Sequence, residues 1–150
     1  MVFKKIINDP YKVVDEMVDG IVLAHQDILK FANNKRAVVR KDAPVKDKVG
    51  ILIGGGSGHE PAFVGYVGKG LADGAAIGNV FASPSPDPVV DATKAISGGK
   101  GVVYIYSPAT HTIRKVGLLD QRLIKSQSIF TTSIKARYRL HYSFMIKCRA

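Results

Sequence analysis

The sequence has a single cysteine and no long uninterrupted run of apolar residues. One cysteine, Cys148, cannot form an internal disulfide, and without a CxxC pair the chain has no thiol motif for metal or redox chemistry. The N-terminal MVFKKIINDP lacks the apolar core of a secretory signal. No stretch approaches the ~18 apolar residues that a membrane-spanning helix needs. These absences predict a soluble, cytoplasmic protein with no membrane partner.

Acidic residues are also scarce, with 12 Asp and Glu against 22 Lys and Arg and a net charge of +10. The excess is uneven, because residues 1–106 hold 13 basic and 11 acidic residues, whereas residues 107–150 hold 9 basic residues and one acid, Asp120. So abrupt a change indicates a boundary at Ser107. The basic residues cluster only weakly and match no nucleic-acid-binding module, so we expect no nucleic-acid partner. The competing interpretation is that residues 107–150 are a genuine basic tail that binds nucleic acid.

Known glycine motifs are missing from the most glycine-rich stretch, residues 48–61 (KVGILIGGGSGHEP). The dinucleotide pattern GxGxxG begins at Gly54 and Gly56 but meets His59 in the place of its third glycine, and a P-loop would need a Gly-Lys-Ser/Thr ending. GxSxG fails as well, because His59 again replaces its last glycine. The stretch therefore predicts neither a nucleotide-binding loop nor a nucleophilic serine.

What this stretch does contain is a short apolar strand followed by a histidine. Residues 49–53 are too few for a typical helix and suit a strand buried on both faces of a parallel sheet. The glycines 54–56 and Gly58 should take the chain off the strand end and form a backbone cradle for a ligand. His59 would then lie where open α/β sheets bind ligands, and an imidazole is suited to proton transfer. The residues leave open whether His59 is catalytic or only orders its loop.

The rest of the chain alternates helix and strand signals, which predicts an α/β domain with a largely parallel sheet. A helix starts at Asp9-Pro10, with His25 at the edge of its apolar stripe. The prolines of residues 83–88 should keep that loop non-helical before Pro88, and the loop either borders the ligand cleft or is a stiff connector. The further elements expected are strands at 37–39, 74–82 and 101–106 and helices at 61–67 and 88–96.

Several motifs in unbroken order identify a family. They are GGGSGHEP (54–61), GYVGKG (65–70), GNVFASPSPD (78–87) and GGKGVV (98–103), preceded by KIINDP (5–10). Together they closely resemble the substrate-binding, DhaK-type subunit of dihydroxyacetone kinase, from about residue 4 to residue 106. Family members are more than twice as long, so the resemblance covers only the first part of their first domain. It implies an incomplete three-layer α/β domain with a largely parallel sheet.

The resemblance also implies a function. Residues 1–106 would be a truncated substrate-binding domain, a fragment of the subunit that binds dihydroxyacetone for phosphorylation to dihydroxyacetone phosphate. His59 would be the catalytic base, and Gly56, Ser57 and Gly58 would hold the substrate with it. We expect the imidazole to face a small polar cavity with these backbone N–H groups pointing into it, and a carbonyl or carboxylate to fix its other nitrogen.

No metal and no cofactor are expected on this chain. The resemblance implies that ATP or ADP binds a separate domain or partner subunit. It further implies a nucleotide-binding kinase subunit and self-association as partners of the intact family member.

The resemblance ends after Tyr106. Where the family has an essential aspartate, this sequence has Thr112, and nothing here matches the later histidine that holds dihydroxyacetone as a hemiaminal. Gly117 is the only glycine in the last 44 residues. We interpret residues 107–150 as a divergent basic tail produced by a frame change and poorly packed, so that the chain alone should be inactive. The alternatives are a non-catalytic ligand-binding or regulatory relative and a non-functional truncated product.

Overall fold

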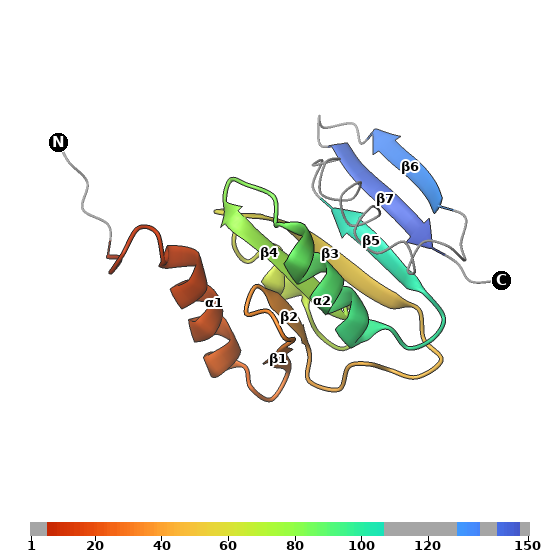
Figure 1. Ribbon diagram of the computed structural model, residues 1–150, viewed down its shortest axis with the longest axis horizontal. Coiled ribbons are helices and arrows are strands. Elements are labelled where there is room, and N and C mark those ends of the chain that lie inside the picture. The colour runs from red at the N-terminus through yellow and green to blue at the C-terminus, as the bar shows by residue number, and fades with distance from the viewer. Residues whose placement is uncertain (1–5, 107–128, 136–140, 148–150) are drawn as a thin grey trace.

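The computed structural model describes residues 6–106 and the backbone of residues 129–135 and 141–147 (Figure 1). In these residues seven strands form one sheet in the order β1-β2-β4-β3-β5-β7-β6. The elements are α1 (Val13–Ala24), β1 (Leu29–Phe31), β2 (Ala37–Arg40), β3 (Gly50–Ser57), the 3₁₀-helix η1 (Val64–Tyr66), β4 (Gly74–Val80), α2 (Pro86–Ile96), β5 (Val102–Tyr106), β6 (Ile129–Lys135) and β7 (His141–Lys147).

The centre of the sheet is parallel and its flanks are antiparallel. β3 lies between β4 and β5 and pairs in parallel with both. On one side β2 pairs antiparallel with β4 and β1 with β2, and on the other β7 pairs antiparallel with β5 and β6 with β7. The predicted α/β class is confirmed, with the parallel pairing confined to the three central strands of a mixed sheet.

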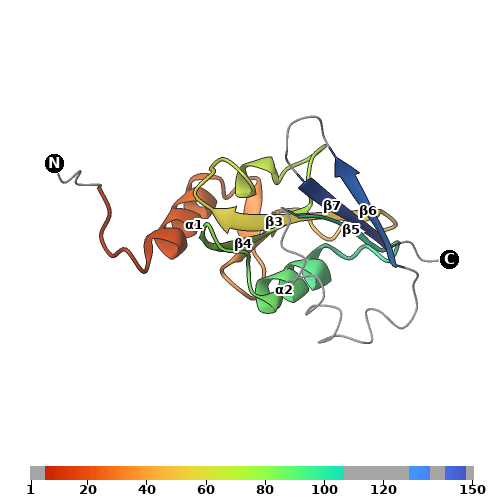
Figure 2. The same cartoon turned by 90° about the horizontal axis from the view of Figure 1, so that it is seen from above.

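Helices cover both faces of the sheet, as expected for three layers. α1 and α2 lie on opposite sides of it (Figure 2). Neighbouring strand residues point to different layers, so Ile53 packs with α1 and η1 while Leu52 packs with α2. β3 is therefore buried on both faces, as its continuous apolar sequence predicts.

Helix α1 follows the predicted amphipathic pattern. Its buried residues Val14, Val18 and Val22 recur every four positions and form one stripe against the sheet. His25 is the exposed residue that ends the helix, in agreement with its place at the edge of that stripe. Its backbone N–H still bonds the carbonyls of Ile21 and Val22.

Helix α2 begins two residues earlier than predicted. Ser85 precedes it, Pro86 is its first residue, and Pro88 lies within its first turn. The prediction that residues before Pro88 are not helical was wrong. The first backbone N–H groups of a helix have no partner inside the helix, so prolines there remove no hydrogen bond.

The predicted helix over residues 61–67 is also wrong in type. Only the three residues of η1 are helical, and they form a 3₁₀ turn with bonds from Tyr66 N–H to Phe63 O and from Val67 N–H to Val64 O. Valines and glycines have low helix propensity, and a single 3₁₀ turn suits so short a segment. The three-residue strand β1 has no counterpart among the predicted elements.

The predicted tail, residues 107–150, lies largely outside the described residues, so its poor packing and its origin stay predictions. The sequence analysis assigned no element there, whereas the structure has β6 and β7 as an antiparallel pair beside β5. Both strands are rich in the β-branched and aromatic residues that favour strands. In the described part of the chain, no helix has the length and apolar character needed to cross a membrane.

Candidate functional site

Strand β3 continues through the glycines that were expected to form a loop. Gly54 pairs with Tyr106 of β5, Gly55 pairs with Ile77 of β4, and after a one-residue irregularity Ser57 pairs with Val80. The loop predicted to start at Gly54 therefore starts four residues later, at Gly58. Of the four glycines in this stretch, only Gly58 has a positive φ, at 109°.

Two of the strand glycines make room for aromatic rings on the two faces of the sheet. A Cβ on Gly54 would lie 2.5 Å from a ring carbon of Tyr106, and one on Gly55 would lie 2.2 Å from the ring of Phe63. Real Cβ atoms do not come so close to other carbons, so a side chain at either position would displace the ring. These glycines serve packing, and the predicted ligand cradle does not include them.

A third close approach joins the ends of β3 and β4. A Cβ on Gly56 would lie 2.7 Å from the backbone nitrogen of Ala82, and one on Gly78 would lie 2.0 Å from the Ala82 oxygen. The segment after β4 thus lies directly on the backbone of both strands. Ser57 belongs to this contact, because its buried hydroxyl donates to Gly78 O at 2.8 Å.

The structure places His59 on an exposed turn just beyond the carboxyl end of β3. Its Nδ1 lies 3.2 Å from the carbonyl oxygen of Gly56. A carbonyl can only accept, so this hydrogen bond requires a proton on Nδ1, and in the neutral imidazole Nε2 then has a free lone pair. The prediction that a carbonyl fixes one ring nitrogen is confirmed, and the tautomer it selects is the one able to accept a proton at Nε2.

The backbone of Gly58 differs from the expectation. Its N–H donates to the carboxylate of Glu60, at 3.0 and 3.1 Å to the two oxygens, and so is engaged within its own turn. The prediction that this N–H points into a cavity was wrong for this state of the loop. A short turn places an acceptor two residues away, and a carboxylate there satisfies an N–H that would otherwise face water.

Phe81 is the residue of this site that the sequence analysis missed. It follows β4, has a φ of 53°, and its ring meets the His59 ring edge-to-face with centroids 5.8 Å apart. Its backbone N–H donates to Ser57 O at 2.8 Å. No local sequence signal marks a phenylalanine for a left-handed backbone, so only the fold brings this ring to His59.

A cluster of buried charges lies at the opposite, amino-terminal end of the central strands. Asp73 accepts from the Arg40 guanidinium at 2.7 Å, from the Lys48 amine, and from the Ile51 backbone N–H at 2.8 Å. The hydrogen bonds that Arg40 donates to Asp42 and to Asp73 raise the pKa of Arg40, against the opposing effect of burial. The sequence analysis missed this cluster as well. Each charge has an opposite partner, which is typical of a structural anchor.

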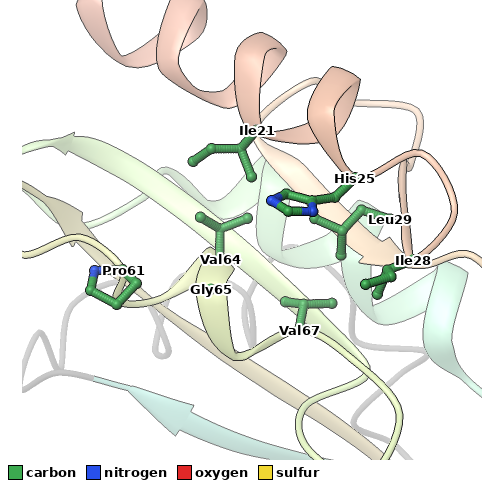
Figure 3. Close-up of a pocket in the computed structure, with 8 residues that line it drawn as sticks. All are labelled: Ile21, His25, Ile28, Leu29, Pro61, Val64, Gly65 and Val67. Carbon is green, nitrogen blue, oxygen red and sulfur yellow. The ribbon is translucent and has the colours of Figure 1, made fainter.

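An apolar pocket of about 270 Å³ lies between the end of α1 and the segment around η1 (Figure 3). His25 reaches into it among Ile21, Leu29 and Val64, and it is the only ionisable side chain in the lining. Binding sites for small polar molecules usually combine several converging polar groups. This pocket has too few polar groups for a catalytic site, so the region around His59 is the better candidate. Across the residues that the structure describes, no three His, Cys, Asp or Glu side chains gather as a metal site.

Curated proteins of known family have sequences similar to this chain. The dihydroxyacetone-binding subunit of the PTS-dependent dihydroxyacetone kinase 2 of Listeria innocua is 48% identical over 104 residues, which are 69% of this chain and 31% of the relative. The chain thus spans less than a third of that protein's length. The resemblance to the substrate-binding subunit is confirmed by this match.

Solved structures of similar fold agree. The dihydroxyacetone kinase of C. freundii, solved in its native form and with AMP-PNP and Mg²⁺, superposes with a TM-score of 0.71 at 34% identity, over 83% of this chain and 23% or 24% of the enzyme. A dihydroxyacetone kinase operon co-activator superposes with a TM-score of 0.63 at 30% identity, over 74% of this chain and 34% of that protein. A model of the Dak1 domain matches residues 19–110, more than half of the chain, and the protein therefore belongs to the Dak1 domain family.

Proposed function

We propose that this chain is a fragment of a dihydroxyacetone kinase subunit, the part that binds dihydroxyacetone for phosphorylation to dihydroxyacetone phosphate. The single observation that carries the proposal is the hydrogen bond between His59 Nδ1 and Gly56 O, which leaves Nε2 free at the carboxyl end of a central parallel strand. Ligands of open α/β sheets bind at this end. The location proposed for the subunit is the cytoplasm, on the sequence features given above.

Phosphoryl transfer leaves the protein mainly the tasks of orienting the groups and stabilising charge. In the proposed mechanism His59 Nε2 accepts the proton of the substrate hydroxyl as that oxygen attacks the phosphorus of the phosphoryl donor and the donor's own bond to that phosphorus breaks. Gly56, Ser57 and Gly58 supply backbone contacts to the substrate. The Gly58 N–H already donates to the exposed carboxylate of Glu60. That carboxylate therefore has to move aside when a substrate oxygen accepts a hydrogen bond from the Gly58 N–H.

The nucleotide, ATP or ADP, is proposed to bind a separate domain or a partner subunit. This is supported by the lack of a P-loop in the sequence and by relatives that are much longer than this chain. A nucleotide-binding kinase subunit and a second copy of the subunit are the partners proposed for the intact protein. Alone, the chain should show no kinase activity with ATP and dihydroxyacetone in a coupled assay.

The test of His59 uses a complete, active protein in which the missing sequence is restored from a relative. His59→Asn should leave the fold intact and lower turnover by about 10² to 10⁴, as expected for loss of a general base. His25→Asn is the matched control, since His25 is an exposed histidine at the end of α1. If His59→Asn lowered stability but not turnover, His59 would only order its loop.

A second candidate is a non-catalytic regulatory or ligand-binding relative. The likeness to an operon co-activator at 30% identity favours it, as does Thr112 in the place of the family's aspartate. The two candidates predict different results when the missing sequence and the aspartate are restored. Adding the missing sequence and Thr112→Asp should produce turnover in a kinase fragment, whereas a regulatory protein should bind dihydroxyacetone without turning it over.

The tail after Tyr106 is proposed to result from a frame change, on the change of charge and glycine content at Ser107. Such an origin would also allow a non-functional truncated product. Genomic DNA just after the Tyr106 codon tests this directly. A shifted frame encoding the family's continuation, with its aspartate, supports the proposal, and an undisturbed frame contradicts it.

A further inference from the structure

The backbone of Phe81 is held in a conformation that phenylalanine disfavours. Its φ of 53° is in the left-handed region, where a Cβ crowds the following carbonyl. The side chain is 79% exposed, so burial of apolar surface does little to offset that cost. An unfavourable backbone around an exposed aromatic ring calls for another reason, and such residues concentrate at functional sites.

Neighbouring hydrogen bonds impose this conformation. The Phe81 N–H donates to Ser57 O at 2.8 Å, and the Ala82 N–H donates to Asn79 O at 3.0 Å. Ala82 itself lies against Gly56, where even a methyl group would not fit. The turn after β4 is thereby fastened to the end of β3, on the strand that carries His59.

The Phe81 ring extends from this turn to His59. The two rings are nearly perpendicular, at 89°, with centroids 5.8 Å apart, which is a favoured arrangement for aromatic pairs. The same ring covers Gly58, where an added Cβ would lie 3.0 Å from Phe81 Cε1. His59 is thus fixed by two contacts, the Gly56 carbonyl from β3 and the Phe81 ring from the end of β4.

We propose that Phe81 is a positioning residue, whose left-handed backbone holds its ring against His59 so that Nε2 keeps one orientation. The purpose of that orientation rests on the proposed function of His59 as a base. The contact itself does not, because it can be observed without substrate. Failure of the proposed function, seen as unchanged turnover in His59→Asn, is therefore distinct from failure of this inference.

The test is NMR spectroscopy of the 150-residue chain with ¹³C-labelled histidine, with the His59 signals assigned by their loss in His59→Asn. Phe81→Gly should move the His59 ring-proton shifts toward those of a free histidine and leave the His25 signals unchanged. Phe81→Tyr, which keeps an aromatic ring, should preserve the parent shifts. Tyr11→Leu, at an aromatic residue that is also exposed, is the control and should change nothing at His59.

Measurements of unfolding show whether Phe81 positions His59 or only stabilises the fold. Glycine adopts positive φ freely, so Phe81→Gly should keep or raise the midpoint of urea unfolding while it removes the His59 signature. Phe81→Leu, which keeps an apolar side chain but no ring, should lose the signature as well. His59 shifts that match the parent in both Phe81→Gly and Phe81→Leu would overturn the proposal, as would equal shift changes in Tyr11→Leu.

Discussion

At the amino-terminal ends of β3 and β4 charged side chains are buried and paired, whereas at the carboxyl ends polar and aromatic side chains are exposed. Arg40 and Asp73, at the first end, have side chains only 7% and 4% exposed. At the second end His59, Glu60 and Phe81 are exposed. The same strands, β3 and β4, run between the two ends. The difference in burial therefore comes from the side chains of the loops at each end.

Stabilising ion pairs are concentrated at the amino-terminal ends of the strands, and side chains accessible to a ligand are found at the carboxyl ends. At the amino-terminal end every strong donor near Asp73 has an acceptor, and the loops before β3 and β4 are joined through that one carboxylate. At the carboxyl end the backbone is tightly packed, yet the imidazole remains open to solvent. The anchored opposite end holds the strands in place, which allows an unfavourable φ at Phe81 and an exposed imidazole at His59.

The largest effect should come from the buried charges. Asp73→Ala removes the buried acceptor of the Ile51 N–H and one of the two carboxylates that bind Arg40, and loss of one partner of a buried ion pair costs about 3 to 5 kcal/mol of unfolding free energy. Urea unfolding of the whole chain measures this. Asp42→Ala is the control, because Asp42 binds the same Arg40 from an exposed position and should matter much less. Equal losses in both variants would mean that burial does not distinguish the two ends.

A smaller effect should come from the backbone packing at the carboxyl end. Gly78→Ala places a methyl group 2.0 Å from the Ala82 oxygen, so the turn that carries Phe81 must shift, at a cost of about 1 to 3 kcal/mol. Gly20→Ala is the matched control. Gly20 is exposed in α1 with no atom near its absent Cβ, and alanine there should stabilise the helix by roughly 0.5 to 1 kcal/mol. A Gly78→Ala variant as stable as the parent would show that the contact between the ends of β3 and β4 is loose.

The smallest effect concerns an exposed ion pair at the carboxyl end. Arg36 bonds Asp15 of α1 and the side chain of Asn79 on β4, and its hydrogen bond lowers the pKa of Asp15 below the ordinary 3.8. A lowered carboxyl pKa adds stability above pH ~3.8, and this is lost as the pH falls through the folded-state value. Because Asp15 is about half exposed, the contribution should stay below about 1 kcal/mol.

The measurement for this pair is the difference in unfolding free energy between the parent and Arg36→Gln from pH 6 down to pH 2. The difference should shrink over the acid end of the range and should also shrink with added salt, since exposed charges are screened. A difference that persists unchanged at pH 2 would assign the effect of Arg36 to its bond with Asn79.

The sequence by itself determined the class of the domain, its central strand and its family. Those features depend on local patterns: the stripe of Val14, Val18 and Val22 in α1, the continuous apolar run of β3, and the ordered glycine motifs. Such patterns act through neighbours along the chain, so they can be recognised before the fold is known. His59 was singled out in the same way, from its place after a buried strand.

Only the tertiary structure decided what the individual residues of the site do. Gly54 and Gly55 were expected to take part in a ligand cradle, but the rings of Tyr106 and Phe63 occupy the space beside them. Phe81 meets His59, and Asp73 meets Arg40, only because strands distant in sequence lie side by side in the sheet. Contacts of this kind depend on the pairing of strands and the distances between their atoms, and no local pattern in the sequence encodes those distances.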